Sequence, residues 1–278
     1  MSTEQPTDAS LIESVRQGDD AALSTLLARH APTVMRFAMK MCRNDADAED
    51  VLQDTLLAAA RGVRDLRGGA AVSTWLYTVA RSYCIKKRRR GKHAPEALVQ
   101  LDAPESAELA APSHEPDDVA AQHEIGAALE RAIAQLDDSA REVIVLRDVE
   151  GLSAAEAAHV LGVSVEAVKS RLHRARADLR VNLSPYVSDT VPTTPSDPAC
   201  PDIVDVLSRH LEGDIGPEAC AAMEAHVASC TSCSAACDSL RRALSLCTTS
   251  AARPLPAEAA ARVRRVLQHV VAAPRSRA

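Results

Sequence analysis

The fold is decided by residues 136–180, LDDSAREVIVLRDVEGLSAAEAAHVLGVSVEAVKSRLHRARADLR. Apolar residues recur there every three or four positions, as on one face of an α-helix, and Gly162 interrupts the pattern. Ser153 and Ser164 stand where helix N-caps are expected. The stretch therefore predicts two short helices joined by a glycine turn, and the second helix of such a pair usually enters the major groove of DNA.

The second helix has an apolar side and a basic side. Val165, Val168 and Leu172 form a stripe that predicts packing against the first helix. A basic face runs from Lys169 to Arg176. Taken alone, such a face also suits a solvated helical hairpin. The side chains expected to reach bases or phosphates are Ser164, Glu166, Lys169, Ser170, Arg171 and Arg174.

Two stretches carry a family resemblance. REVIVLRDVEGLS (141–153) and VEAVKSRLHRAR (165–176) resemble region 4 of the extracytoplasmic-function (ECF) sigma factors of the sigma-70 family. In that family region 4 binds the promoter's −35 element. The resemblance implies a non-enzymatic transcription initiation factor whose partners are core RNA polymerase and promoter DNA.

The composition fits an all-α protein. Glycine is scarce, helical periodicities dominate and alternating strand patterns are absent. The net charge of −6 averages segments of opposite sign, so it does not exclude DNA binding. No apolar run approaches the roughly 18 residues that a membrane span needs, and a cytoplasmic location without membrane contact is expected. A Gly-rich phosphate loop, an H-E-x-x-H motif and a base beside a nucleophile are all missing, so no enzyme is predicted.

Residues 45–55, DADAEDVLQDT, form a strongly acidic helix start. Acidic side chains there suit the positive end of the helix dipole, which by itself is a sufficient explanation. The stretch also resembles sigma region 2.2, which docks on the clamp of RNA polymerase. This resemblance assigns polymerase binding to Asp47, Glu49, Asp50, Gln53 and Asp54.

Residues 71–90, AVSTWLYTVARSYCIKKRRR, combine three of the chain's five aromatic residues with a basic run. Aromatic rings can stack on unpaired bases, but packing in the core is an equal alternative for Trp75. The segment resembles regions 2.3 and 2.4, which open and read the −10 element. It departs from the common Arg-Asn at Arg81-Ser82, which leaves the bases read there open. The predicted DNA contacts are Trp75, Arg81, Lys86, Lys87, Arg88 and Arg89.

Six of the eight cysteines fall between Cys200 and Cys247. In a reducing compartment such a cluster favours metal or thiol chemistry. On one continuous helix, offsets of 4, 7 and 11 from His226 reach Cys230, Cys233 and Cys237 on nearly the same face. Thiolates with an imidazole suit zinc, and also the softer copper(I) and cadmium ions.

The same stretch resembles the zinc-binding anti-sigma fold. The resemblance assigns the metal to Cys200, His226, Cys230 and Cys233, with His210 as a competitor for the first position. Cys220, Cys237 and Cys247 are candidate additional ligands. A sigma factor with a fused Cys-rich tail is similar to the metal-responsive CorE-type group, and the extra thiols favour metal sensing. A thiol-redox sensor and a purely structural zinc site stay open as alternatives.

The predicted organisation has six parts. A region 2 bundle (1–91) and a region 4 helix-turn-helix (124–184) are joined by an acidic, Pro-containing linker (92–123), either a tether or a segment that threads the polymerase. A second linker (185–199) leads to the Cys-rich domain (200–250). An amphipathic helix (251–278) follows, which either packs on a sigma domain or is an exposed tail. We expect the C-terminal domain to contact the sigma domains and regulate them in cis.

Overall fold

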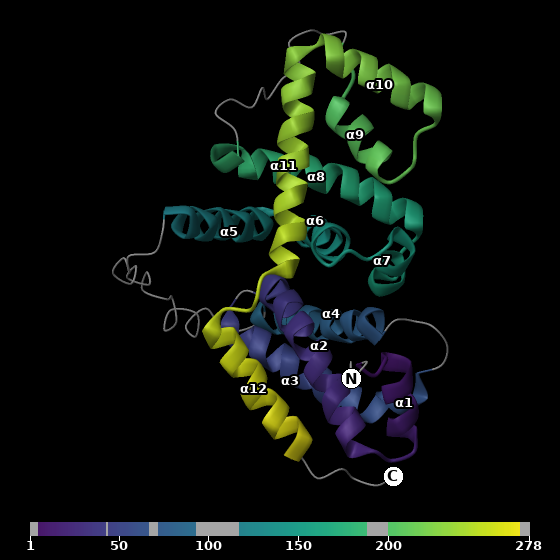
Figure 1. Cartoon of the computed structure of the whole chain (residues 1–278), viewed down its shortest axis with the longest axis vertical. Helices are drawn as coiled ribbons and strands as arrows, with labels where there is room; N and C mark the ends of the chain where they lie inside the picture. The colour runs from purple at the N-terminus through teal and green to yellow at the C-terminus, as the bar shows by residue number, and fades with distance from the viewer. Residues whose placement is uncertain (1–4, 43, 67–71, 93–116, 188–199, 273–278) are drawn as a thin grey trace. The chain divides into compact units, whose positions relative to one another are not determined.

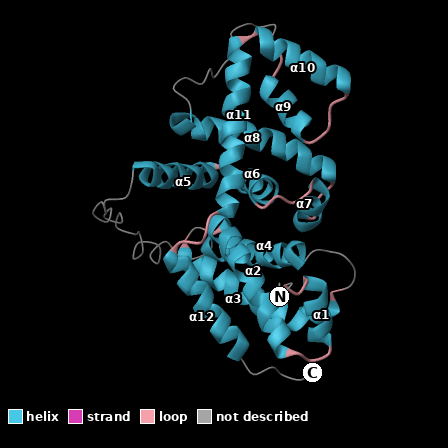
Figure 2. Cartoon of the chain, viewed as in Figure 1, coloured by secondary structure: helices cyan, strands magenta, loops and turns pink. Residues whose placement is uncertain are grey.

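The computed structural model describes residues 5–42, 44–66, 72–92, 117–187 and 200–272. Within these ranges every regular element is a helix, which confirms the all-α prediction (Figure 2). The chain divides into two compact units, the first made of residues 1–105 with 254–278 and the second of residues 106–253. Among the described helices none is long and apolar enough to cross a membrane.

The first unit is built around one long central helix. Its elements are α1 (Asp8–Arg16), α2 (Asp20–Met41), α3 (Asp45–Gly62), the short helix η1 (Val63–Asp65), α4 (Val72–Lys92) and α12 (Ala257–Ala272). Helix α2 contacts α1, α3, α4 and α12. Phe37 is fully buried, and its ring lies 5.2 Å from the ring of Tyr77 on α4. This pair anchors the core of the unit.

Side-chain caps set where these helices start. Asp19 accepts hydrogen bonds from the first turn of α2, and Asn44 accepts one from the N–H of Asp47 in α3.

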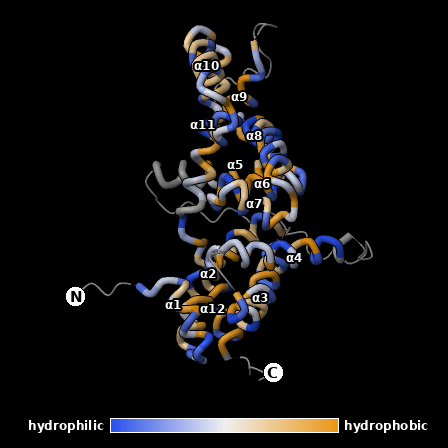
Figure 3. Tube along the Cα trace, turned by 90° about the vertical axis from the view of Figure 1, so that its right-hand side faces the viewer, coloured by the Kyte–Doolittle hydropathy of each residue, from blue (hydrophilic) through white to orange (hydrophobic). Residues whose placement is uncertain are grey.

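Helix α12 comes from the C-terminal end of the chain, and its apolar stripe packs against α2 and α3. Figure 3 shows the apolar residues gathered where these helices meet. The buried members of the stripe are Ala259, Val263, Val266 and Val270.

The second unit contains the helix-turn-helix and the Cys-rich segment. Its elements are α5 (Asp117–Gln135), α6 (Asp138–Ile144), η3 (Val145–Val149), α7 (Ala154–Leu161), α8 (Val165–Val187), α9 (Ile203–Leu211), α10 (Pro217–Ser229) and α11 (Thr231–Ala252). Helix α11 crosses α8, and α9 also packs on α8 (Figure 1). The Cys-rich segment therefore shares a core with the helix-turn-helix.

The predicted local signals of the helix-turn-helix are confirmed. Ser153 forms a capping box with Glu156 at the start of α7. Gly162 ends that helix in the left-handed conformation, with φ of +67°, which glycine adopts without strain. The Ser164 hydroxyl accepts a hydrogen bond from the N–H of Ala167 in α8.

Two predicted boundaries differ from the structure. Helix α5 begins at Asp117, inside the segment 92–123 that was expected to be an extended linker. Helix α8 extends to Val187, three residues beyond the predicted end at 184, and Pro185 lies within it. The rest of the predicted linkers, residues 93–116 and 188–199, lies outside the described residues.

Candidate functional site

A four-residue cluster lies where three helices of the Cys-rich segment meet. Cys200 precedes α9, His226 is in the last turn of α10, Cys230 joins α10 to α11 and Cys233 is in the first turn of α11. The candidate ligand atoms of the four residues all lie within 4.8 Å of one another. His226 Nε2 is 3.1 Å from Cys233 Sγ, and Cys200 Sγ is 3.9 Å from Cys230 Sγ. The structure thus brings together the four predicted metal ligands.

The electrostatics of the cluster suit a bound cation. Burial raises the pKa of the Cys233 thiol to about 12, and the neighbouring thiols of Cys230 and Cys200 add to the shift. Three thiols with one imidazole form a donor set typical of tetrahedral structural zinc sites. These residues therefore fit a zinc ion, which would hold the thiols as thiolates and tie the start of α9 to α10 and α11.

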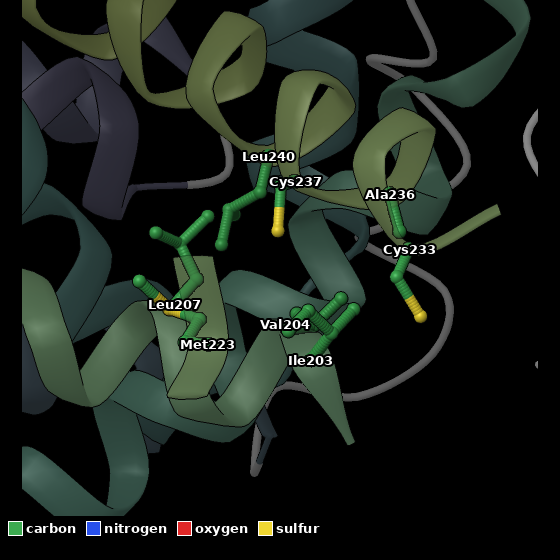
Figure 4. Close-up of a cluster of buried hydrophobic side chains, with 8 residues drawn as sticks. All are labelled: Ile203, Val204, Leu207, Met223, Cys233, Ala236, Cys237 and Leu240. Atoms are coloured by element: carbon green, nitrogen blue, oxygen red, sulfur yellow. The ribbon is translucent and has the colours of Figure 1, made fainter. Parts of the chain in front are cut away.

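The expectation that His226, Cys230, Cys233 and Cys237 converge from one helical face is wrong. The helix is interrupted at Cys230, which has extended backbone angles (φ −117°, ψ 107°). After this break Cys237 falls in a buried apolar cluster with Leu207 and other side chains. In Figure 4 the sulfur of Cys237 points into that cluster, whereas the sulfur of Cys233 points away from it at the edge.

The other sulfur and histidine candidates lie apart from the cluster of four. Cys247 is fully buried further along α11. His210 Nδ1 is 3.2 Å from Cys220 Sγ, so these two residues form a separate pair. The structure places Cys200, not His210, with the H-x3-C-x2-C ligands.

Four of the predicted DNA-contacting residues, Glu166, Lys169, Ser170 and Arg174, lie beside the Cys-rich segment. Lys169 forms an ion pair with Asp214, which follows α9. An open cleft of about 480 Å³ lies beside this pair. From α8 it is lined by Glu166, Lys169, Ser170, His173 and Arg174, and from the Cys-rich segment by Asp205, Arg209 and Asp214. Ser164 is exposed at the start of the helix, and Arg171 is partly buried.

The expectation that the basic face of α8 runs to Arg176 is wrong, because that residue is only 3% exposed. Its guanidinium donates to both carboxylate oxygens of Asp148, at 2.6 and 3.0 Å. It also donates to Glu212 of the Cys-rich segment, at 2.9 Å. Arg147 reaches the other oxygen of Glu212, at 2.5 Å. Arg176 therefore joins the helix-turn-helix to the end of α9.

The acidic helix α3 is paired with basic side chains of α12. Arg262 lies 2.9 Å from Asp45 and 3.9 Å from Glu49. Arg265 lies 3.2 Å from Glu49. Of the predicted polymerase-binding residues, Asp50 and Asp54 are exposed and Gln53 is partly buried. Part of the predicted polymerase-binding surface is thus covered by α12.

The basic end of α4 meets the same acidic helix. Lys87 forms ion pairs with Asp50 and, at 3.5 Å, with Asp47. These ion pairs raise the pKa of Lys87, chiefly through the hydrogen bond to Asp50. Lys86 and Arg89 are exposed, whereas Arg81 and Arg88 are partly buried.

The aromatic residues of α4 divide between core and edge. Tyr77 belongs to the core, whereas Trp75 is half-buried. The indole of Trp75 lies so close to Gly62 on α3 that a Cβ there would be 3.2 Å from the ring. Trp75 therefore packs with one edge and is partly accessible with the rest of its surface.

Comparison with known proteins shows which family the chain resembles. A family model described as sigma-70 region 2 matches residues 26–94, one for sigma-70 region 4 matches residues 126–179, and a zinc-finger model matches residues 200–234. The ECF RNA polymerase sigma factor SigM of Mycobacterium tuberculosis is 36% identical over 173 residues, which cover 62% of this chain and 83% of the relative. The chain belongs to the ECF sigma factors. Members of this family are transcription initiation factors that bind core RNA polymerase and DNA, and they are not enzymes.

Other similar proteins include sigma factors of more distant sequence. The ECF sigma factor SigE of Mycolicibacterium smegmatis is 33% identical over 194 residues, covering 68% of this chain and 72% of the relative. A solved structure of CnrH in complex with the cytosolic domain of CnrY has 28% identity and a TM-score of 0.47, over 66% of this chain and 99% of that chain.

Several paired residues were missed by the sequence reasoning. Glu212 and Asp214 are ordinary acidic residues after a helix, and Arg262 and Arg265 are ordinary polar residues of an amphipathic helix. Only the sign of their charge could have indicated these pairings. Glu212 and Asp214 are acidic and contact basic side chains, and Arg262 and Arg265 are basic and contact acidic side chains. The pairing became visible once α9 and α12 were placed on α8 and α3.

Proposed function

We propose that this cytoplasmic sigma factor directs promoter-specific initiation and is inhibited in cis by its C-terminal segment, residues 200–272. The observation that carries the proposal is a match of charge. The segment offers acidic side chains to the helix predicted to bind DNA and basic side chains to the helix predicted to bind polymerase.

The contact on α8 supports exclusion of promoter DNA. Lys169 is predicted to contact bases or phosphates, and a carboxylate of Asp214 pairs with its ammonium group. Phosphate contacts contribute much of the affinity of DNA-binding proteins. A cation that is already paired with a carboxylate, beside a cleft lined by Asp205, is a poor partner for a phosphate. DNA binding would require α9 and the turn after it to leave α8.

The contact on α3 supports exclusion of polymerase. Arg262 and Arg265 occupy Asp45 and Glu49 with the kind of charge that a basic partner surface would bring. The apolar stripe of α12 is buried in the same contact, so the helix is held by more than exposed ion pairs. Polymerase would have to displace α12 to reach this part of α3.

The metal centre would set the stability of the inhibitory segment. Cys200 lies just before α9, and a zinc ion would link it to His226, Cys230 and Cys233. Helix α9 leads directly into Glu212 and Asp214, the acids that meet the helix-turn-helix. Loss of the metal would therefore loosen the acids from α8 and favour the active form. The zinc-finger match favours zinc, whereas no observation speaks for copper or cadmium.

Promoter-dependent transcription with purified core polymerase tests the inhibition. Asp214→Asn and the double variant Arg262→Ala, Arg265→Ala, each in the full chain, should transcribe more than the parent protein at equal concentration. Arg264→Ala is the matched control, because Arg264 is exposed on α12. Equal transcription by all four proteins would contradict inhibition in cis, and no core-dependent transcription by any of them would contradict initiation.

Metal analysis tests the centre separately. Cys230→Ser should lower the zinc content per chain and raise transcription, whereas Cys220→Ser, which removes a thiol outside the cluster, should change neither. An unchanged zinc content in Cys230→Ser would remove that residue from the ligand set. If peroxide releases the zinc and raises transcription, whereas a metal chelator does not raise transcription, the segment is a thiol-redox sensor. Zinc loss without any change in transcription would make the site purely structural.

A further inference from the structure

Two cysteines far from the metal centre meet in the first unit. Cys42 caps the C-terminus of α2, and Cys84 lies in the middle of α4. Their sulfur atoms are 3.6 Å apart. The two residues are 42 positions apart in the chain, so this contact is created by the packing of α2 on α4. The pair is separate from the cluster of Cys200, His226, Cys230 and Cys233.

We propose that Cys42 and Cys84 are a thiol-oxidation site, which a hydroperoxide converts to a reversible intramolecular disulfide. The sulfur atoms are already in van der Waals contact, so side-chain rotation and a small approach of the helices would bring them to the bonding distance of about 2.05 Å. A disulfide formed in a reducing compartment is transient and regulatory in most cases. The inference does not depend on inhibition by the C-terminal segment.

The two thiols differ in a way that suits sequential chemistry. Cys42 is partly exposed, whereas Cys84 is 0% exposed. The hydrogen bond with Cys84 lowers the pKa of Cys42, and the positive charges of Arg88 and Lys87 act in the same direction against burial and Asp47. A low thiol pKa with solvent access marks the cysteine that is oxidised first. Cys42 therefore fits the attacking thiol and Cys84 the resolving thiol.

The reaction needs no further reductant or oxidant. The Cys42 thiolate attacks one oxygen of hydrogen peroxide, the O–O bond breaks, and hydroxide leaves and is protonated to water, which gives a Cys42 sulfenic acid. The sulfur of Cys84 then attacks the sulfenic sulfur, the S–O bond breaks, and the departing hydroxide takes the thiol proton as water. Two thiols and one peroxide thus yield one disulfide and two waters.

The location gives the bond a consequence. Cys84 precedes the basic end of α4, where Lys87 pairs with Asp47 and Asp50. Cys42 lies just before the start of α3. A disulfide would tie the end of α2 to α4 at the junction between the helix predicted to bind polymerase and the helix predicted to bind DNA. The cross-link would raise the thermal midpoint of this unit by roughly 5 °C or more.

Peptide mapping of the zinc-loaded full-length protein tests the site. The protein is treated with a small molar excess of hydrogen peroxide, alkylated with N-ethylmaleimide and digested without reduction. The expected product is a linked pair of peptides containing Cys42 and Cys84, lighter by two hydrogens than the reduced pair and separated by dithiothreitol. Recovery of both cysteines as alkylated thiols, at a dose that oxidises cysteines of the tail, would overturn the proposal. Linkage of Cys42 to any other cysteine, or to a second chain, would also overturn it.

Variants assign the order of the two thiols. In Cys84→Ser, whose hydroxyl can still donate a hydrogen bond to Cys42, the sulfenic acid of Cys42 should persist long enough to be trapped by dimedone, with far-UV circular dichroism confirming that the helices form. Cys220→Ser is the matched control and should give the same linked peptide as the parent protein. Failure to trap a Cys42 adduct in folded Cys84→Ser would refute Cys42 as the attacking thiol. The mapping of the unsubstituted protein decides the site itself, even if the Cys84 variant does not fold.

Discussion

The C-terminal segment meets the two sigma regions by different physical means. On region 4 it contributes Glu212, whose side chain is 3% exposed and which joins a buried network with Arg176 and Asp148. On region 2 it contributes an apolar stripe flanked by ion pairs, and the side chain of Arg265 is 61% exposed there. The first contact is a buried polar network, and the second is apolar packing with a solvated rim.

This difference predicts different responses to mutation and to solvent. Removing one member of a buried ion network leaves its partners as uncompensated buried charges, which is strongly destabilising. Exposed ion pairs contribute little and are screened by salt. The contact on region 4 should therefore depend on single charged residues, and the contact on region 2 on its apolar residues.

The largest effect is expected from Arg176→Ala. The substitution removes the cation that Asp148 and Glu212 share and leaves Glu212 paired with Arg147 alone, so the free energy of unfolding should fall by about 3–5 kcal/mol. Urea denaturation monitored by circular dichroism measures it. Arg174→Ala, two residues earlier on α8 and exposed, should change it by about 0.5 kcal/mol or less. Similar losses of stability in the two variants would mean that the buried ion network contributes no more to stability than an exposed arginine does.

The next effect is expected from Val263→Asp. Val263 is buried in the stripe of α12, and burying a carboxylate in its place should destabilise the packing of α12 by at least about 2 kcal/mol. Helix α12 should detach from α2 and α3 while the second unit stays folded. Hydrogen exchange with mass spectrometry should show lost protection in α12 but not in α11. Arg264→Asp, on the exposed side, serves as the control, and an equal loss in both would argue against packing by the stripe.

A smaller effect should come from pH through His173 on α8. Its pKa is lowered from the ordinary 6.5, chiefly by burial, so the folded state favours the neutral ring. Below that value the unfolded chain binds more protons than the folded chain, and stability falls as the pH drops from 7.5 to 5.5. The charged groups around the ring are Asp205, Asp214, Arg176 and Arg209. Urea midpoints at the two pH values should differ less in His173→Gln, and an unchanged difference would assign the pH response to other groups.

The smallest effect is expected from salt. Raising the ionic strength from about 0.1 M to about 1 M shortens the Debye length from roughly 10 Å to roughly 3 Å. The pairs of Arg262 and Arg265 with α3 should weaken slightly, and the buried pair of Arg176 should not. Hydrogen exchange should therefore rise in α12 before it rises in α9. If hydrogen exchange rises first in α9, the contact on region 4 depends more on screened charges than the contact on region 2, which would contradict the expected difference.

The sequence by itself determined the local architecture and the family. Capping by Ser153 and termination by Gly162 involve neighbours within a few residues, so the helix-turn-helix could be predicted in detail. The motif His226-x3-Cys230-x2-Cys233 likewise lies within one short stretch, although its break at Cys230 was not foreseen. Such features depend on backbone hydrogen bonds and spacing, which are properties of adjacent residues.

The tertiary structure alone decided which surfaces are covered. Arg176 had the same basic character as Arg174 in the sequence, and it is buried because Glu212, 36 residues later, packs over it. The pairing of Arg265 with Glu49 spans 216 residues, and the contact of Cys42 with Cys84 spans 42. Contacts of this kind arise from the summed packing of many apolar side chains. No local pattern specifies which distant charge or thiol will be the neighbour.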